Sequence, residues 1–211
     1  MQNVEELNYE VIATGSKGNC VVIDDIMIDC GVPYTKLKEK LYDVNYLLIT
    51  HIHSDHVRAS TFNYIKKSFP NITIISNYDV AQVHEVDIII NAGFELITDD
   101  YVFHAFECVH DVPTYGYHWE HTDDVGIIYA TDTSNLNFAP QDMKFDYLFL
   151  ESNHDEAKLE LVRGRSKKLG YDAYSGGLRH LSTKKSKEYY YMNRKSKESK
   201  HIELHMSERF Y

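Results

Sequence analysis

The chain has 211 residues, of which 43% are hydrophobic and 26% charged, and this composition excludes a fibre or a wholly disordered chain. Its formal net charge is −10, although residues 158–200 are rich in lysine and arginine. That basic segment would either steer an anionic substrate to one side of an acidic body or simply form a solvated helix. No apolar run approaches the roughly 20 residues of a membrane span, and the first residues do not form a signal peptide.

The cysteines and the length predict a single intracellular domain. Cys20, Cys30 and Cys108 are widely spaced and form no Cys-x-x-Cys pair, so neither a disulfide framework nor a thiolate zinc site is expected. A reducing cytoplasm fits this usage, with each thiol filling a core. We expect one domain over residues 1–211, without a membrane partner and with a homodimer as one possible assembly.

Periodicity along the chain predicts a mixed α/β domain. In the first half, strands are expected over residues 9–13, 20–23, 26–30, 45–50 and 72–75, and helices over 33–41, 57–68 and 78–84. In the second half, strands are expected over 95–98, 101–108, 115–120, 126–131, 147–151 and 201–204, and helices over 155–162 and 183–194. Many strands with interspersed helices predict two sheets packed face to face with helices outside.

Histidines gather directly after one buried strand, in Thr50-His-Ile-His-Ser-Asp-His56. In an extended segment His51 and His53 point to the same side, where two neutral imidazoles bind one divalent ion. Asp55 and His56 follow where the chain must turn, and they would reach a neighbouring position, as in two-metal hydrolytic sites. Burying so many titratable groups together is costly unless a cation compensates, so the pattern predicts metal binding.

Three further ligand-type residues follow predicted strands. His110 follows residues 101–108, Asp132 follows residues 126–131, and His205 follows residues 201–204. Loops gather at strand exits in layered α/β folds, so each of these side chains is a candidate to complete the site.

Taken in order, these residues resemble the motifs of the metallo-β-lactamase fold hydrolases, and the resemblance is closest to the phosphodiesterase branch. The loop Ala13-Thr-Gly-Ser-Lys-Gly-Asn19 resembles that branch's Gly-Ser-x-Gly-Asn loop. Residues 110–117 and 150–155 look like segments of YycJ-type exonucleases, and residues 179–182 resemble their Gly-His-Leu-Ser segment with Arg179 in place of glycine. The tail, residues 204–211, is similar to the last motif of RNase Z.

The resemblance implies an αββα sandwich with two metal ions at one edge. It implies His51, His53 and His110 on the first ion, Asp55, His56 and His205 on the second, and Asp132 bridging them. Zinc is the usual metal and manganese an alternative, because histidine and carboxylate ligands do not decide between them. Metal-activated hydroxide would attack the phosphate, and Asp55 counts among the catalytic residues as well as the ligands.

The same resemblance suggests a proton donor for the leaving group. Attack on phosphorus leaves an alkoxide that must be protonated, and His180 is the candidate general acid, with Glu151 holding its orientation. Ser16 and Asn19 lie on a loop expected near the metals, where they would either bond phosphate oxygens or shape the turn. His154 and Asp155 would cap the following helix or take part in the site.

Two enzymatic functions and one non-enzymatic function remain open at this point. The YycJ-like segments and the basic final third favour a nuclease acting on DNA or RNA. A small acidic protein also suits a cyclic-nucleotide phosphodiesterase resembling phage anti-Pycsar enzymes. A non-catalytic binder that kept the fold is disfavoured by the intact set of ligand-type residues.

Overall fold

The computed structural model describes residues 7–121, 124–164, 172–208 and 210–211. The chain divides into two compact units, Met1–Asn91 and Ala92–Tyr211, called here the first unit and the second unit. Each unit holds one six-stranded sheet, and the mixed α/β class predicted from the sequence is confirmed. Residues 165–171 of the basic segment and residue 209 of the tail lie outside the described residues. One domain over residues 1–211 stays a prediction.

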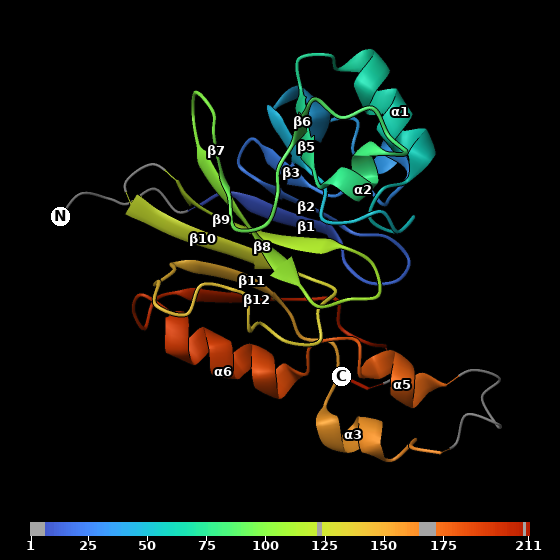
Figure 1. Cartoon of the computed structure of the whole chain (residues 1–211), viewed down its shortest axis with the longest axis vertical. Coiled ribbons are helices and arrows are strands. Elements are labelled where there is room, and N and C mark those ends of the chain that lie inside the picture. The colour runs from blue at the N-terminus through green and yellow to red at the C-terminus, as the bar shows by residue number, and fades with distance from the viewer. Residues whose placement is uncertain (1–6, 122–123, 165–171, 209) are drawn as a thin grey trace. The chain divides into compact units, whose positions relative to one another are not determined.

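The sheet of the first unit follows chain order, β1-β2-β3-β4-β5-β6 (Figure 1). Its strands are β1 (Tyr9–Ala13), β2 (Cys20–Ile23), β3 (Ile26–Ile28), β4 (Tyr46–Leu48), β5 (Thr73–Ser76) and β6 (Ile88–Ile89). The first three pair antiparallel, whereas β3 to β6 are parallel. Strands β2, β3 and β4 are buried along their whole length, which explains why they read as continuous apolar runs instead of alternating ones.

Two helices cover one face of this sheet. Helix α1 (Ala59–Ser68) contributes Phe62 and Ile65, and helix α2 (Tyr78–Ala81) contributes Val80, to a core that also contains Leu47 and Ile74. Asn77 begins α2, because its side chain accepts a hydrogen bond from the backbone N–H of Val80. Both helices therefore pack on the same side of β4 and β5.

The sheet of the second unit has the order β12-β11-β10-β9-β8-β7. Its strands are β7 (Glu95–Ile97), β8 (Val102–Cys108), β9 (Thr114–His121), β10 (Val125–Ala130), β11 (Tyr147–Glu151) and β12 (Lys200–Leu204). Strands β7 to β10 form an antiparallel meander, and β10, β11 and β12 are parallel. Strands β8, β10, β11 and β12 consequently run in the same direction, and their carboxyl ends lie at one edge of the sheet.

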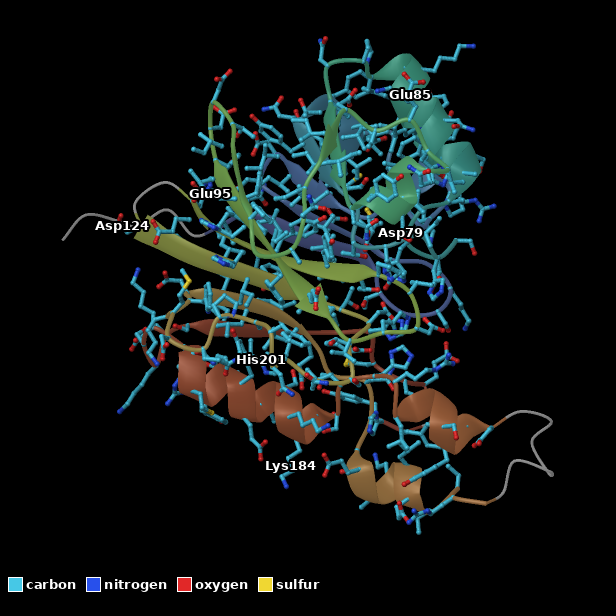
Figure 2. All side chains as sticks on the ribbon, viewed as in Figure 1. Asp79, Glu85, Glu95, Asp124, Lys184 and His201 are labelled. Carbon is cyan, nitrogen blue, oxygen red and sulfur yellow. The ribbon has the colours of Figure 1, made fainter. Side chains whose placement is uncertain are left out.

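The described residues of the second unit include the helices α3 (Glu156–Glu160), α5 (Ala173–Gly177) and α6 (Thr183–Asn193). Helix α6 runs along the sheet (Figure 1), where Tyr189 joins a core with Ile128, Leu148 and Phe145. His201 of β12 lies between the strand and this helix (Figure 2), with Nε2 3.0 Å from Ser186 Oγ. The helix begins at the Ser182 cap, whose Oγ accepts from the Lys185 backbone N–H.

The structure corrects some of the predicted elements. Residues 33–41 were expected to form one helix. The structure instead has two short 3₁₀ helices in this region, Tyr34–Lys36 and Lys40–Tyr42. The predicted strand 26–30 ends at Ile28, and this shortening leaves Asp29 outside the strand. Strand β6 and helix α5 were not predicted, because elements of two and five residues carry too little periodicity to detect.

All three cysteines are buried and free, as expected of core residues. Among the described residues, no helix combines the length and the apolar character that a membrane span requires.

Candidate metal site

The histidine segment of the first unit forms a compact cluster after β4. His51 and His56 are fully buried, and His51 Nε2 lies 3.1 Å from His53 Nδ1, so the two alternating histidines converge as expected. Asp55 is partly exposed, with Oδ2 3.9 Å from His56 Nε2. With the anchoring residue Asp29, described next, these four side chains make up the first-unit cluster.

Asp29 anchors this cluster and was missed in the sequence. Its buried carboxylate lies 2.7 Å from His56 Nδ1 and accepts hydrogen bonds from the Thr50 backbone N–H (2.8 Å) and hydroxyl (2.9 Å). Burial raises the pKa of Asp29, while the bonds from His56 and Thr50 act in the opposite direction. The strand-exit rule that identified His110, Asp132 and His205 would have found Asp29 if β3 had been predicted to end at Ile28.

The loop before β2 supports the same cluster. Asn19 is buried, its Oδ1 accepts from the Gly15 N–H (2.7 Å), and its Nδ2 lies 2.8 Å from His56 Nε2. This loop therefore shapes a turn and contacts a predicted ligand. Gly31 must be glycine, because a Cβ atom there would lie 1.7 Å from the carbonyl oxygen of Asp55.

In the second unit, five predicted site residues converge at one sheet edge. The second-unit cluster consists of His110 after β8, Asp132 after β10, Glu151 at the end of β11, His180 between α5 and α6, and His205 after β12. They meet because β8, β10, β11 and β12 run in the same direction and end at the same edge. Ligand-type atoms of four of them, Asp132, Glu151, His180 and His205, all lie within 4.8 Å of one another.

Asp132 lies at the centre of this cluster. Its Oδ1 is 3.9 Å from His110 Nε2, 3.6 Å from His205 Nε2 and 3.4 Å from His180 Nδ1. One carboxylate oxygen therefore lies within 4 Å of a nitrogen from each of three imidazoles. A single buried carboxylate surrounded by three histidines is well suited to bind cations.

Glu151 contacts two of the three histidines that lie around Asp132. Its Oε1 lies 2.7 Å from His180 Nδ1 and 3.2 Å from His205 Nδ1, and its Oε2 accepts from the backbone N–H groups of Thr133 (2.8 Å) and Leu181 (3.2 Å). Burial alone would raise the pKa of Glu151, but the bonds from His180 and His205 outweigh it and lower that pKa. Glu151 is therefore a carboxylate that fixes the orientation of both rings.

Three members of the clusters have left-handed backbone conformations. Asp29, Asp132 and His205 have φ angles of 61°, 50° and 54°. Each lies one or two residues after the end of a strand. Such conformations are uncommon outside glycine and concentrate at functional sites.

Asp155 caps a helix, which was one of the two roles predicted for it. Its side chain accepts a hydrogen bond from the Lys158 N–H at the start of α3.

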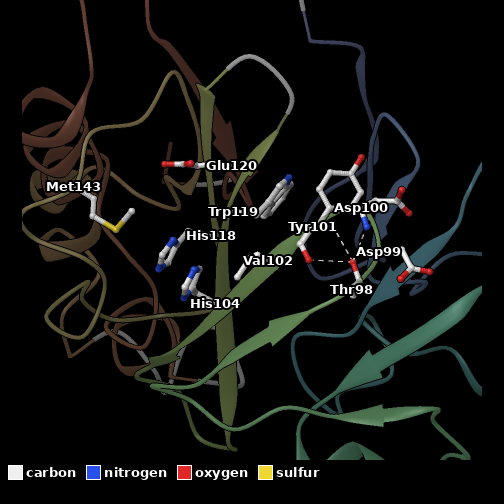
Figure 3. A pocket seen from close by; sticks show the side chains of 10 residues that line it. All are labelled: Thr98, Asp99, Asp100, Tyr101, Val102, His104, His118, Trp119, Glu120 and Met143. Atoms are coloured by element: carbon white, nitrogen blue, oxygen red, sulfur yellow. Dashed lines mark hydrogen bonds between the residues drawn. The ribbon is translucent and has the colours of Figure 1, made fainter.

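A separate pocket of about 530 Å³ lies in the second unit (Figure 3). Its described lining includes none of the predicted site residues. In this pocket the rings of His104 and His118 stack with their centroids 4.6 Å apart. Burial, and to a smaller extent the neighbouring His104, lowers the pKa of His118 to about 4.

Comparison with known structures supports the fold assignment. YhfI from Bacillus subtilis, a metallo-beta-lactamase fold protein, matches 96% of this chain and 87% of its own with a TM-score of 0.71 and 16% identity. The match with human tRNase Z, short form (ELAC1), covers 95% of this chain and 93% of that protein, with a TM-score of 0.70 and 15% identity. The match with a diphosphatase of the PhnP family covers 97% of this chain and 88% of that protein, with a TM-score of 0.65 and 15% identity. At these identities the likeness establishes the fold alone.

No curated protein matches the sequence. The family comparison is positive: residues 13–137, more than half of the chain, match the metallo-beta-lactamase superfamily. This match and the structural neighbours confirm the predicted fold class. Superfamily membership and the clusters of histidine and carboxylate side chains together support a metal-dependent hydrolase. The chain belongs to the metallo-beta-lactamase superfamily.

Proposed function

We propose that the protein is a dinuclear-metal-dependent phosphodiesterase that hydrolyses nucleic acid. One observation carries this proposal: His180, held at 2.7 Å by the buried Glu151, lies beside Asp132 in a cluster of ligand-type side chains. A carboxylate-oriented histidine suits a reaction whose leaving oxygen needs a proton. The pair of His180 and Glu151 would have no role in β-lactam hydrolysis or in a glyoxalase reaction.

The donor set fits divalent cations. In the first unit, the Asp29 carboxylate bonds His56 Nδ1, so this ring has the tautomer in which Nε2 carries the lone pair. A cation at Nε2 would replace the contact with Asn19, whose amide keeps the Asp55 carbonyl as an acceptor at 3.2 Å. In the second unit, the bond between Glu151 and His205 Nδ1 orients that ring in the same manner.

We propose the ligand assignment that the family resemblance implies. One ion would be held by His51, His53 and His110, the other by Asp55, His56 and His205, with Asp132 between them. His110 Nε2 and His205 Nε2 lie 3.9 Å and 3.6 Å from Asp132 Oδ1, so this carboxylate is close to a proposed ligand of each ion. Zinc suits imidazole and carboxylate ligands, and manganese is the alternative.

When bound, the two cations supply activation of water and neutralisation of charge on the phosphate. The chain's own residues supply the proton. In the protonated His180 ring, Nδ1–H bonds Glu151, and Nε2–H would be donated to the leaving oxygen as the P–O bond breaks. Glu151 stabilises the protonated ring before transfer and fixes its orientation throughout. A positioned acid of this kind accelerates a reaction by about 10²–10⁴-fold.

Basic and aromatic side chains on α6 support a nucleic acid as the substrate. Lys184 extends from this helix (Figure 2), and Arg194 lies over the ring of Tyr191 at 4.8 Å. Lysines neutralise phosphates, and exposed aromatic rings stack on bases. Two of the structural neighbours are named as a tRNase and a diphosphatase. With free, buried cysteines, we also propose a cytoplasmic location.

A parallel substrate panel with metal analysis tests this function. Purified protein would be analysed for bound zinc and manganese and incubated with labelled DNA and RNA oligonucleotides and with 3′,5′-cyclic nucleotides. We expect two ions per chain and cleavage of an oligonucleotide. Cleavage of cyclic nucleotides alone would replace the nuclease by the cyclic-nucleotide phosphodiesterase, and inactivity on every phosphodiester of the metal-loaded protein would refute the proposal.

A further inference from the structure

A pocket of about 220 Å³ lies beside His180 in the second unit. Its described lining comes from α3, from α5 and from the segment that leads from His180 into α6. His180 is thus shared between the second-unit cluster and this pocket. The other lining residues have no place in the metal assignment or in the proton transfer.

We propose that this pocket binds the nucleobase of the leaving-group nucleotide. The inference rests on the proposed function, because the pocket gains this role from His180. The acid that protonates the leaving oxygen must contact the leaving group. A pocket that has the same histidine in its wall is therefore placed to receive the next part of that group, the sugar and its base.

The size and the walls of the pocket fit one ring system. Its volume lies below the roughly 300–1,000 Å³ of pockets that enclose drug-sized ligands, so a whole nucleotide would not be enclosed. Leu159, which is buried, and Leu178, which is 53% exposed, supply apolar surface, and Tyr174 supplies an aromatic ring. Flat apolar and aromatic surfaces are what the faces of a base contact.

The polar groups of the lining fit the edge of a base. His154 is 3% exposed, and its buried Nδ1 has no hydrogen-bond partner within the part of the chain that the structure describes. A neutral imidazole offers one donor and one acceptor, as a base edge does. Lys185, also in the lining, adds a positive charge to the wall of the pocket.

The test compares two dinucleotides that differ only in the leaving residue, one with its base and one abasic. For the metal-loaded protein we expect kcat/KM at least about tenfold higher for the base-bearing dinucleotide, the range of base stacking on an aromatic side chain. Leu178→Trp, a change at a half-exposed position, should fill the pocket and bring this ratio near one. Leu161→Trp, at the exposed residue directly after α3 and outside the pocket, is the matched control and should keep the ratio.

Binding of uncleavable versions, with the scissile oxygen replaced by methylene, gives a second readout. We expect the base-bearing version to bind at least about fivefold tighter and to lose this advantage in Leu178→Trp. Cleavage of both dinucleotides at equal rates would overturn the pocket assignment and leave the phosphodiesterase intact. Cleavage of neither would refute the proposed function, and equal dissociation constants would then still refute the pocket.

Discussion

The two clusters contain similar side chains but are built in different ways. In the first-unit cluster, four of the five residues lie within the six positions 51–56 after β4, and only Asp29, which follows β3, comes from elsewhere in the sequence. In the second-unit cluster, the five residues come from four strand ends and one inter-helix segment. The first therefore depends on a local turn, whereas the second depends on the direction and register of β8, β10, β11 and β12.

Each cluster has a buried carboxylate that orients histidines. Asp29 bonds His56 in the first unit, and Glu151 bonds His180 and His205 in the second. The difference is that Asp29 serves a predicted ligand, whereas Glu151 serves a predicted ligand and the proposed acid together. Substitutions at the centre and the support of each cluster should separate these roles.

The largest effect is expected at the centre of the second-unit cluster. Asp132→Ala removes the carboxylate that has three imidazoles around it, so turnover should fall below detection and bound metal should decrease by at least one ion per chain. Elemental analysis and hydrolysis assays on the same preparation measure both. Retention of two ions with full activity would exclude a bridging role.

The next largest effect is expected at His180. His180→Ala should lower turnover of an oligonucleotide by about 10²–10⁴-fold and leave the metal content unchanged, because this residue donates a proton and is not assigned as a ligand. A p-nitrophenyl phosphodiester is the matched substrate, since its leaving oxygen departs without a proton and the loss should be much smaller. Loss of metal would instead mean that His180 and His205 exchange roles.

A smaller effect is expected at the support of the first-unit cluster. Asp29→Ala leaves His56 Nδ1 and Thr50 without their carboxylate, so metal affinity should fall by about 10–100-fold. Competition with a chelator measures this affinity. Asp79→Asn, which changes a partly exposed carboxylate in the same unit (Figure 2), is the control and should bind metal like the wild type. Equal affinities in all three proteins would show that Asp29 does not support a ligand.

The smallest effect concerns stability, away from both clusters. The pKa of His118 is about 4 in the folded chain and 6.5 in its unperturbed form, so the unfolded state binds more protons between these values. Stability should therefore decrease as pH falls from 6.5 to 4, by at most about 3 kcal/mol. His118→Phe should flatten this dependence in denaturant titrations. An unchanged slope would show that His118 is not the group that titrates.

The sequence predicted the first-unit cluster more completely than the fold around it. Alternation alone was sufficient to bring His51 and His53 together, because the geometry of an extended segment is local. Asp29 was missed because its role depends on where β3 ends, and a boundary error of two residues concealed it. The convergence of His110, Asp132 and His205 depends on strand directions that periodicity does not contain, and for these residues the family resemblance was needed.

The left-handed residues at Asp29, Asp132 and His205 have a consequence for engineering. Such conformations cost a non-glycine residue up to about 1–2 kcal/mol, which glycine would not incur. At Asp29, however, glycine would also leave the buried Thr50 N–H without its acceptor, which costs about 1–3 kcal/mol. Heat resistance and turnover therefore favour the same residue at this strand end, and the strained backbone conformation persists because the carboxylate is needed there for both.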